Sequence, residues 1–298
     1  MVGLPRGLKK GVDVRHLPVF RTMGFAFRFV IERLPQMLAR AALPAVSGFV
    51  LLYVLISVYL DEIERFLSAP DAQGASLILG IASLAFFSML FIHVVLRASI
   101  AALVLGQPSP GWTFFPAGHP IWRLYAANLR LMLLGAPVAA IVLKYGALPG
   151  RPTPLFADPD YLSYPVLIDA LALAIFVYLA ARILFLMPPV VLSERGQIVR
   201  RAWRLGSGNV WRMIIISVAL AVPGVLLQIV VETIFQAFGM LPTITVGATL
   251  SEIVRVLQHN LPQLILSWFL GYLLNMILMV VGGAYAYRHI TAQTPEAA

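Results

Sequence analysis

Residues 261–290 read LPQLILSWFLGYLLNMILMVVGGAYAYRHI, an almost wholly apolar stretch that meets its first charged residue at Arg288. A helix needs about 20 mainly apolar residues to cross the hydrocarbon core of a bilayer. The stretch exceeds that length and predicts a membrane-spanning helix over about 262–286. We therefore expect lipid, and not water, around this part of the chain.

Five other stretches meet the same length requirement. The whole chain is 60% hydrophobic and 12% charged, about half the charged fraction of an ordinary soluble protein. The sequence thus predicts an all-α, polytopic membrane protein that forms one domain over residues 1–298. Its six predicted spans cover about 41–60, 78–105, 124–145, 163–188, 212–237 and 262–286.

The basic residues orient these predicted spans. Loops rich in Lys and Arg stay in the cytoplasm, and with the N-terminus inside, all but four of the 22 Lys and Arg residues fall on the cytoplasmic side. The exceptions are Arg65, Lys144, Arg151 and Arg255. We therefore predict cytoplasmic N- and C-termini. The net charge of +9 favours anionic phospholipid over nucleic acid as a partner, because the basic residues lie between apolar runs.

Residues 193–213, SERGQIVRRAWRLGSGNVWRM, concentrate five arginines in a chain that has few charges. At 100° per residue, Arg200, Arg201 and Arg204 share one arc of a helix, and Ser193 is a candidate N-cap. We predict an amphipathic helix over about 193–206 that lies along the cytoplasmic membrane surface, with Trp203 and Trp211 as anchors at headgroup depth.

A second amphipathic helix is predicted over about 20–38, before the first span. The spans also suggest a threefold repeat of helix hairpins. Each odd-numbered span holds a proline among small residues, and each even-numbered span carries an arginine toward its cytoplasmic end. The prolines are Pro44, Pro137 and Pro223, and the arginines are Arg97, Arg182 and Arg288. The alternative is ordinary proline-kinked helices with no repeat.

Arg97 and Arg182 are candidate binding residues because both lie within predicted spans. Charged side chains are costly there and often mark a functional site. Guanidinium groups suit phosphate, so the two arginines could grip a phosphate-bearing lipid or solute, together with contacts from Arg200, Arg201 and Arg204. In the alternative interpretation, Arg97 and Arg182 reach the headgroups or tie helices together by hydrogen bonds.

A second set of polar residues lies toward the outer side of the predicted spans: Asp169, Gln228, Glu232 and Asn275. Gln228 and Glu232 are four residues apart and share a helix face. The set could line a water-filled path for a transporter. Carboxylates near helix ends are also common without any such role.

The sequence gives no indication of catalysis. It has no cysteine, and none of the metalloprotease, serine hydrolase or phosphate-loop motifs occurs in it. The five histidines are scattered. We therefore expect no catalytic residue, metal or cofactor.

Residues 181–220, ARILFLMPPVVLSERGQIVRRAWRLGSGNVWRMIIISVAL, carry a resemblance to a bacterial family. A span that exits through a P-x-V-V-L motif, a basic RRAWRL…GNVWR helix and a further span resemble the membrane domain of some glycerophosphodiester phosphodiesterases and its stand-alone relatives. The resemblance implies a polytopic protein of the bacterial inner membrane. It does not imply phosphodiesterase activity, which resides in a separate soluble domain.

The sequence therefore favours a non-enzymatic scaffold or accessory protein in envelope or lipid homeostasis, which contacts anionic phospholipid through its arginine-rich cytoplasmic face. The alternative function is a transporter or channel for a small solute or lipid. Protein partners and oligomeric state do not follow from the residues.

Overall fold

The computed structural model describes residues 16–68, 72–107, 119–145, 170–172, 174–175, 178–240 and 250–292. Within these ranges, the residues for which it describes only the backbone are chiefly 134–145 and 250–259. All regular structure in these segments is helical. The elements are α1 (Val19–Ser68), α2 (Ala72–Leu105), α3 (Pro120–Tyr145), the π-helix η2 (Ala180–Leu184), α5 (Met187–Ser193), α6 (Ile198–Gly206), α7 (Val210–Ala237) and α8 (Leu250–Thr291). The prediction of an all-α fold is confirmed for the described part of the chain.

Four of these helices are long and apolar enough to cross a membrane: α1, α2, α7 and α8. They contain the spans predicted over 41–60, 78–105, 212–237 and 262–286. The span over 124–145 coincides with α3, and much of the span over 163–188 lies outside the described residues. These last two spans, and the threefold repeat, stay predictions.

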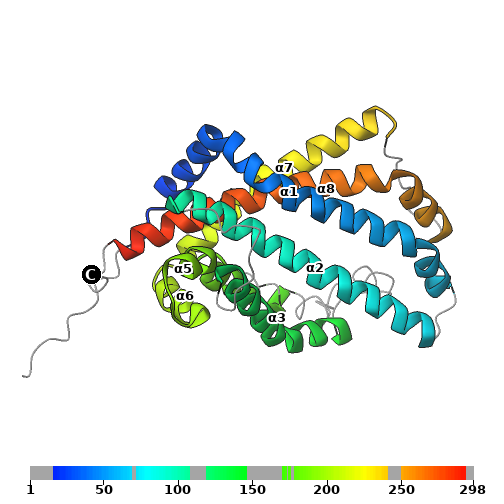
Figure 1. Ribbon diagram of the computed structural model, residues 1–298, viewed down its shortest axis with the longest axis horizontal. Coiled ribbons are helices and arrows are strands. Elements are labelled where there is room, and N and C mark those ends of the chain that lie inside the picture. The colour runs from blue at the N-terminus through cyan, green and yellow to red at the C-terminus, as the bar shows by residue number, and fades with distance from the viewer. Residues whose placement is uncertain are drawn as a thin grey trace, which may run out of the picture.

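Helix α1 joins two elements that the sequence predicts separately. It runs without interruption through both 20–38 and 41–60, with Pro35 and Pro44 inside it. A proline inside a helix removes one backbone hydrogen bond and forces a bend. Figure 1 shows such a bend between the N-terminal part of α1 and the longer part that follows.

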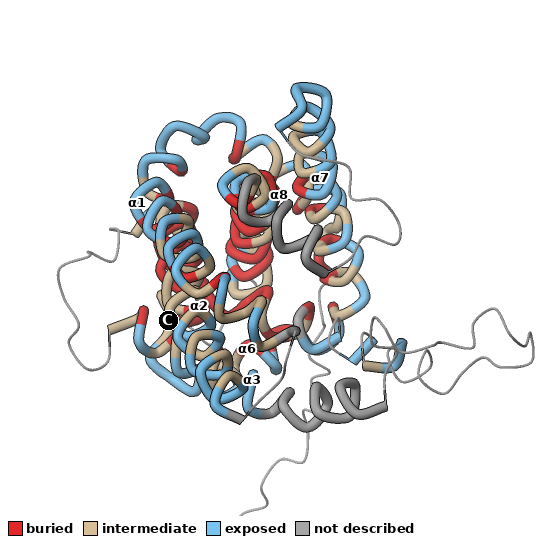
Figure 2. The backbone as a smooth tube through the Cα atoms, turned by 90° about the vertical axis from the view of Figure 1, so that its right-hand side faces the viewer, coloured by how far each residue is buried: buried red, intermediate tan, exposed pale blue. Residues whose placement is uncertain are grey.

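Helix α8 lies at the centre of the bundle. Half of the residues in its most apolar 18-residue segment are buried, whereas only 17% are buried in the corresponding segments of α2 and α7. It packs against α7, α1, α2 and α5, and Figure 2 shows its buried length surrounded by more exposed helices. The other three spanning helices therefore turn most of their apolar surface outward.

The outward-facing surface is apolar. On α7, Val218, Val225 and Leu226 are each more than half exposed, and similar residues continue to Ile234. A soluble monomer rarely exposes a continuous apolar patch of this kind. The exposed faces are those expected of helices surrounded by lipid tails.

The start of α1, the end of α2, the start of α7, the end of α8 and the whole of α6 gather at one end of the bundle (left in Figure 1). The backbone N–H of Leu17 donates to Asn209 Oδ1 at 2.9 Å, which joins the starts of α1 and α7. We call this end the arginine end, because Arg195, Arg200 and Arg204 lie exposed there. The opposite end holds Asp61 near the end of α1.

Helices α7 and α8 approach closely at a pair of glycines. A Cβ atom on Gly224 would lie 2.7 Å from the backbone oxygen of Gly271, and one on Gly271 would lie 2.9 Å from the backbone oxygen of Gly224. Small residues allow this kind of contact between helix backbones in membranes. The two glycines therefore fix the crossing of α7 and α8.

The predicted amphipathic helix over 193–206 is wrong at its start. Ser193 is not an N-cap but the last residue of α5, and α6 begins at Ile198 with Gln197 as its N-cap. Two prolines, Pro188 and Pro189, occupy the first turn of α5, where a missing N–H costs nothing. The P-x-V-V-L segment therefore forms a buried helical turn of its own instead of a direct exit from a span.

Candidate functional site

Helix α6 separates its apolar and basic residues by burial. Ile198, Ala202 and Leu205 are buried, while Arg200 and Arg204 on the other side are exposed. The buried residues face η2, α5 and α3, which α6 contacts. Packing thus holds the helix against the bundle and leaves its arginines outside.

A groove with a volume of about 1140 Å³ lies beside α6. We call it the arginine-lined groove. Its walls are formed by α3, by η2 with Ile183, by the loop at 195–197 and by the first turn of α6. Four arginines line it: Arg123, Arg130, Arg195 and Arg200.

One face of α3 forms a wall of the groove. Arg123 and Arg130 are seven residues apart, about 10 Å along a helix axis, and both line the groove. Ala126 and Ala127 lie on the same face between them. Because alanine is short, this face leaves a hollow with an arginine at each end.

The charge in the groove is uncompensated within the described part of the chain. No Asp or Glu is among the lining residues. Arg130, Arg195 and Arg200 take part in none of the ion pairs of the described residues. Their guanidinium groups are therefore available to an anion from outside the chain.

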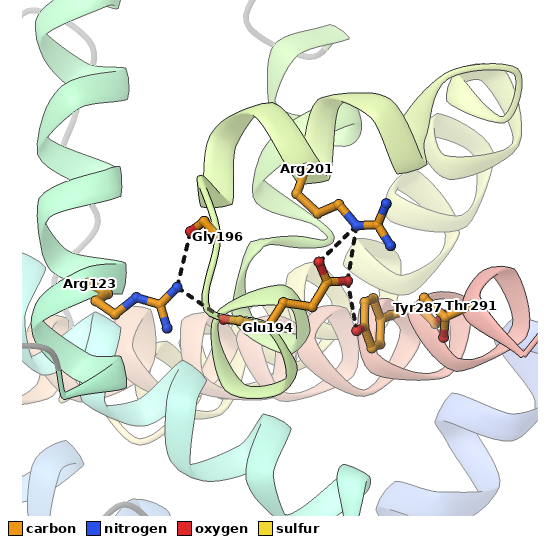
Figure 3. A network of polar contacts seen from close by, with 6 residues as sticks. All are labelled: Arg123, Glu194, Gly196, Arg201, Tyr287 and Thr291. Carbon is orange, nitrogen blue, oxygen red and sulfur yellow. Dashed lines mark hydrogen bonds and ion pairs between the residues drawn. The ribbon is translucent and has the colours of Figure 1, made fainter. Parts of the chain in front are cut away.

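Arg123 holds the groove wall in place. Its Nη2 atom donates to the backbone oxygens of Glu194 at 3.0 Å and Gly196 at 3.1 Å (Figure 3). Its Nη1 atom donates to the backbone oxygen of Val191 at 3.4 Å. These carbonyls belong to the end of α5 and the loop that follows it. The guanidinium thus fixes the loop that carries Arg195.

The side chain of Glu194 ties the same loop to two other helices. Its carboxylate lies 2.8 Å from Nε of Arg201 on α6 and accepts a hydrogen bond from the hydroxyl of Tyr287 on α8 at 3.0 Å (Figure 3). Arg201 is therefore paired with a carboxylate of its own chain, whereas its neighbour Arg200 lines the groove. Of the two neighbours, Arg200 has the free guanidinium.

Arg182 lies against Trp203. The centre of its guanidinium is 3.5 Å from the centroid of the Trp203 ring, and it donates to the hydroxyl of Tyr178. A cation over an indole face is the strongest of the cation–π arrangements. Arg182 also lines a second cavity of about 510 Å³ with Trp211 and Arg212.

Arg97 is almost fully buried, with 8% of its surface exposed. Its guanidinium donates to the backbone oxygen of Leu184, at the end of η2, and its Nη1 atom lies 3.4 Å from Nε2 of His93. His93 in turn contacts the hydroxyl of Tyr272 on α8. These contacts correspond to the alternative in which Arg97 ties helices together.

The structure gives Arg97 and Arg182 separate partners. Neither is among the residues that line the arginine-lined groove. Arg200 lines it, and Arg204 lies outside its lining on the exposed side of α6. Anion binding by Arg97 and Arg182 stays a prediction.

The two predicted anchor residues are accessible. Trp203 is 36% exposed on α6, and Trp211 is 77% exposed at the start of α7. Both lie at the arginine end of the bundle, where the apolar helices begin or end. Their depth in a membrane stays a prediction.

The predicted polar path is only partly within the described residues, because Asp169 lies outside them. Gln228 donates to Glu232 Oε1 at 2.9 Å, one turn along α7. Asn275 has a buried Oδ1 atom without a partner in the described part of the chain. Gly224 brings α7 against Asn275, so the helices are closely packed at that level, and the path stays a prediction.

Three of the groove arginines are not among the binding residues that the sequence predicts: Arg123, Arg130 and Arg195. The seven-residue spacing in RLYAANLR, with alanines between, was a usable signal for a hollow basic face. No signal in the sequence places that face beside α6. Among the described residues, no group of His, Asp or Glu is arranged to hold a metal ion.

No protein-family model matches the chain, and neither the curated proteins nor the solved structures include a significant match to it. The resemblance to the membrane domain of glycerophosphodiester phosphodiesterases therefore stays a prediction.

Proposed function

We propose that this chain is a non-enzymatic scaffold or accessory protein of the bacterial inner membrane, which acts in envelope or lipid homeostasis and contacts anionic phospholipid through its arginine end. One observation supports this proposal most strongly. Arg195, Arg200 and Arg204 are all exposed at the same end of a bundle that contains four long apolar helices. Anionic phospholipid headgroups lie at the ends of a spanning bundle and attract exposed basic residues there.

The orientation of the bundle is part of this proposal. The arginine end faces the cytoplasm, because Lys and Arg near the ends of spans favour that side. The described termini, at the start of α1 and the end of α8, lie at this same end (Figure 1). Both termini are then cytoplasmic.

Helix α6 lies at the membrane surface in this proposal. Tryptophan prefers the headgroup region, where its ring is half in an apolar environment. Trp203 lies between the exposed Arg200 and Arg204 on α6, and the exposed Trp211 lies at the start of the next helix, α7. An arginine near an anionic surface contributes about 1 kcal/mol of attraction, so three or four of them give a marked preference for anionic lipid.

Quenching of tryptophan fluorescence by brominated lipids tests this function. The full chain is reconstituted into mixtures that contain brominated phosphatidylglycerol or brominated phosphatidylcholine. We expect several-fold stronger quenching by phosphatidylglycerol, and a loss of this difference when Arg195, Arg200 and Arg204 are all changed to Gln. Salt should weaken the preference, because it screens exposed charges.

Arg65→Gln provides the control. Arg65 is an exposed arginine at the opposite end of α1, paired with Glu62 at 2.9 Å. Its replacement should leave the lipid preference unchanged. Equal quenching of the wild-type chain by the two lipids would refute the proposed function.

A further inference from the structure

The arginine-lined groove is a cavity, and apolar as well as basic side chains line it. We infer that it holds one anionic phospholipid molecule, with the phosphate bound by Arg130, Arg195 and Arg200 and an acyl chain lying over Leu131, Leu179 and Ile183. This inference rests on the proposed function, since it names a discrete lipid site within the arginine end.

The basic lining of the groove fits a phosphate. Three arginines line it without an ion-pair partner among the described residues, and no lining residue is acidic. Guanidinium groups present paired N–H donors that match the oxygens of a phosphate. Arg123 adds a fourth positive charge while its N–H groups bind the loop carbonyls.

The first turn of α6 adds hydrogen-bond donors to the basic lining. Gln197, Ile198 and Arg200 line the groove, and α6 begins without a side-chain cap. The first N–H groups of a helix have no partner within the helix, and the helix dipole favours an anion there. A phosphate beside Arg200 would satisfy these donors.

The apolar lining of the groove fits an acyl chain and not a soluble anion. Leu131 from α3 and Leu179 and Ile183 from the segment before α5 line it. A site for inorganic phosphate would leave these side chains against water. The volume of about 1140 Å³ is larger than the roughly 300 to 1,000 Å³ of ordinary small-ligand sites, and far larger than a phosphate ion alone needs.

Contacts within the protein also hold the groove open. Ala126 and Ala127 keep the α3 face low between its two arginines. Hydrogen bonds at Glu194 hold the opposite loop to α3, α6 and α8: its backbone oxygen accepts from Arg123, and its carboxylate accepts from Arg201 and Tyr287. The cavity therefore does not depend on the ligand for its shape.

Native mass spectrometry of the full chain in detergent tests the inference. Phosphatidylglycerol is added to the protein, and phosphatidylcholine and inorganic phosphate are added in separate arms. We expect one retained phosphatidylglycerol per chain, no retained phosphatidylcholine, and no displacement by millimolar phosphate. The double variant Arg195→Gln and Arg200→Gln should lower the retained lipid at least tenfold.

Two further variants separate a groove from a surface. Ala126→Trp fills the hollow at an exposed position without changing the charge, and we expect it to remove the bound lipid. Ala126→Leu gives a smaller obstruction if the Trp variant does not purify. Arg204→Gln removes an arginine of α6 that does not line the groove, and it should keep the lipid.

The outcomes distinguish this site from the proposed function. If Arg204→Gln lowers the retained lipid as much as the groove variants, and the Ala126 variants do not lower it, the contact is diffuse and the groove site is wrong. If inorganic phosphate displaces the lipid, the groove is a soluble-anion site and the inference is again wrong. In both cases the brominated-lipid preference persists and the proposed function stands.

Discussion

The carboxylate of Glu194 and the guanidinium of Arg201, seven residues apart, form an ion pair of 2.8 Å across the loop between α5 and α6. Their side chains are 27% and 32% exposed, so solvent screens the pair only in part. Tyr287 on α8 donates to the same carboxylate at 3.0 Å. One acidic residue thus joins the wall of the arginine-lined groove to the central helix.

Glu194→Gln should loosen α6 from the bundle. The amide keeps an oxygen for Tyr287 but removes the charge that holds Arg201. Because the pair is partly exposed, we expect the free energy of unfolding in detergent to fall by about 1 kcal/mol. Hydrogen exchange should become faster over α6 and stay unchanged in the apolar part of α7.

The pair between Glu62 and Arg65 gives a matched control for this variant. It is a Glu–Arg pair of 2.9 Å in which the arginine side chain is 73% exposed. Glu62→Gln should change stability by less than about 0.5 kcal/mol. Equal effects of Glu62→Gln and Glu194→Gln would show that the link to α8 adds nothing.

Gly224→Ala should separate α7 from α8. The new Cβ atom would lie 2.7 Å from the backbone oxygen of Gly271 and 2.8 Å from Cβ of Asn275, so the helices must move apart. Crowding of this kind costs about 1–3 kcal/mol, and a thermal shift assay in detergent should report a lower melting temperature.

Gly80→Ala is the control for the glycine contact. Gly80 lies inside α2, and a Cβ atom there would have nothing within 4 Å. Alanine favours a helix over glycine by roughly 0.5–1 kcal/mol, so this variant should be neutral or slightly more stable. A loss of stability in Gly80→Ala equal to that in Gly224→Ala would point to a general effect of the substitution.

The sequence predicts the spanning helices well because hydrocarbon imposes one simple rule. Long apolar runs identify α2, α7, α8 and the later part of α1, and their lengths follow from the bilayer. It predicts local breaks poorly. Ser193 has the chemistry of an N-cap, but tertiary packing places it at the end of α5.

The groove arises from contacts that no local pattern contains. Arg130 and Arg200 come from helices separated by about 70 residues, and only the fold puts them in one cavity. Arg123 and Glu194 meet for the same reason. The arginine content of residues 193–213 predicts an anionic partner, but it does not predict which of these arginines lack an internal partner.

Arg97→Gln should weaken the contact between α2 and the segment that ends at Leu184. The guanidinium bonds to the Leu184 carbonyl and lies beside His93, and a shorter amide leaves that carbonyl without its donor. A buried group that loses its partner costs about 1–3 kcal/mol. The melting temperature in detergent should fall accordingly.

Arg97→Lys should not restore the full stability, because a single ammonium group lacks the fork that reaches two partners. Arg28→Gln is the control, since the Arg28 side chain is 80% exposed and pairs with Glu32 in the same helix. A variant at Arg97 that is as stable as Arg28→Gln would show that this buried arginine does not tie the helices.

Cysteine labelling in cells tests the orientation of the bundle, and the chain suits this experiment because it has no cysteine of its own. Ser207→Cys places a thiol at the exposed end of α6, and Asp61→Cys places one at the opposite end of the bundle. Because the arginine end is expected in the cytoplasm, a membrane-impermeant maleimide should label Asp61→Cys in spheroplasts and Ser207→Cys only after the membrane is permeabilised. The cysteine-free parent chain should remain unlabelled in both conditions. Labelling of Ser207→Cys in intact spheroplasts, with protection of Asp61→Cys, would reverse the orientation and place the arginine-lined groove on the outer leaflet.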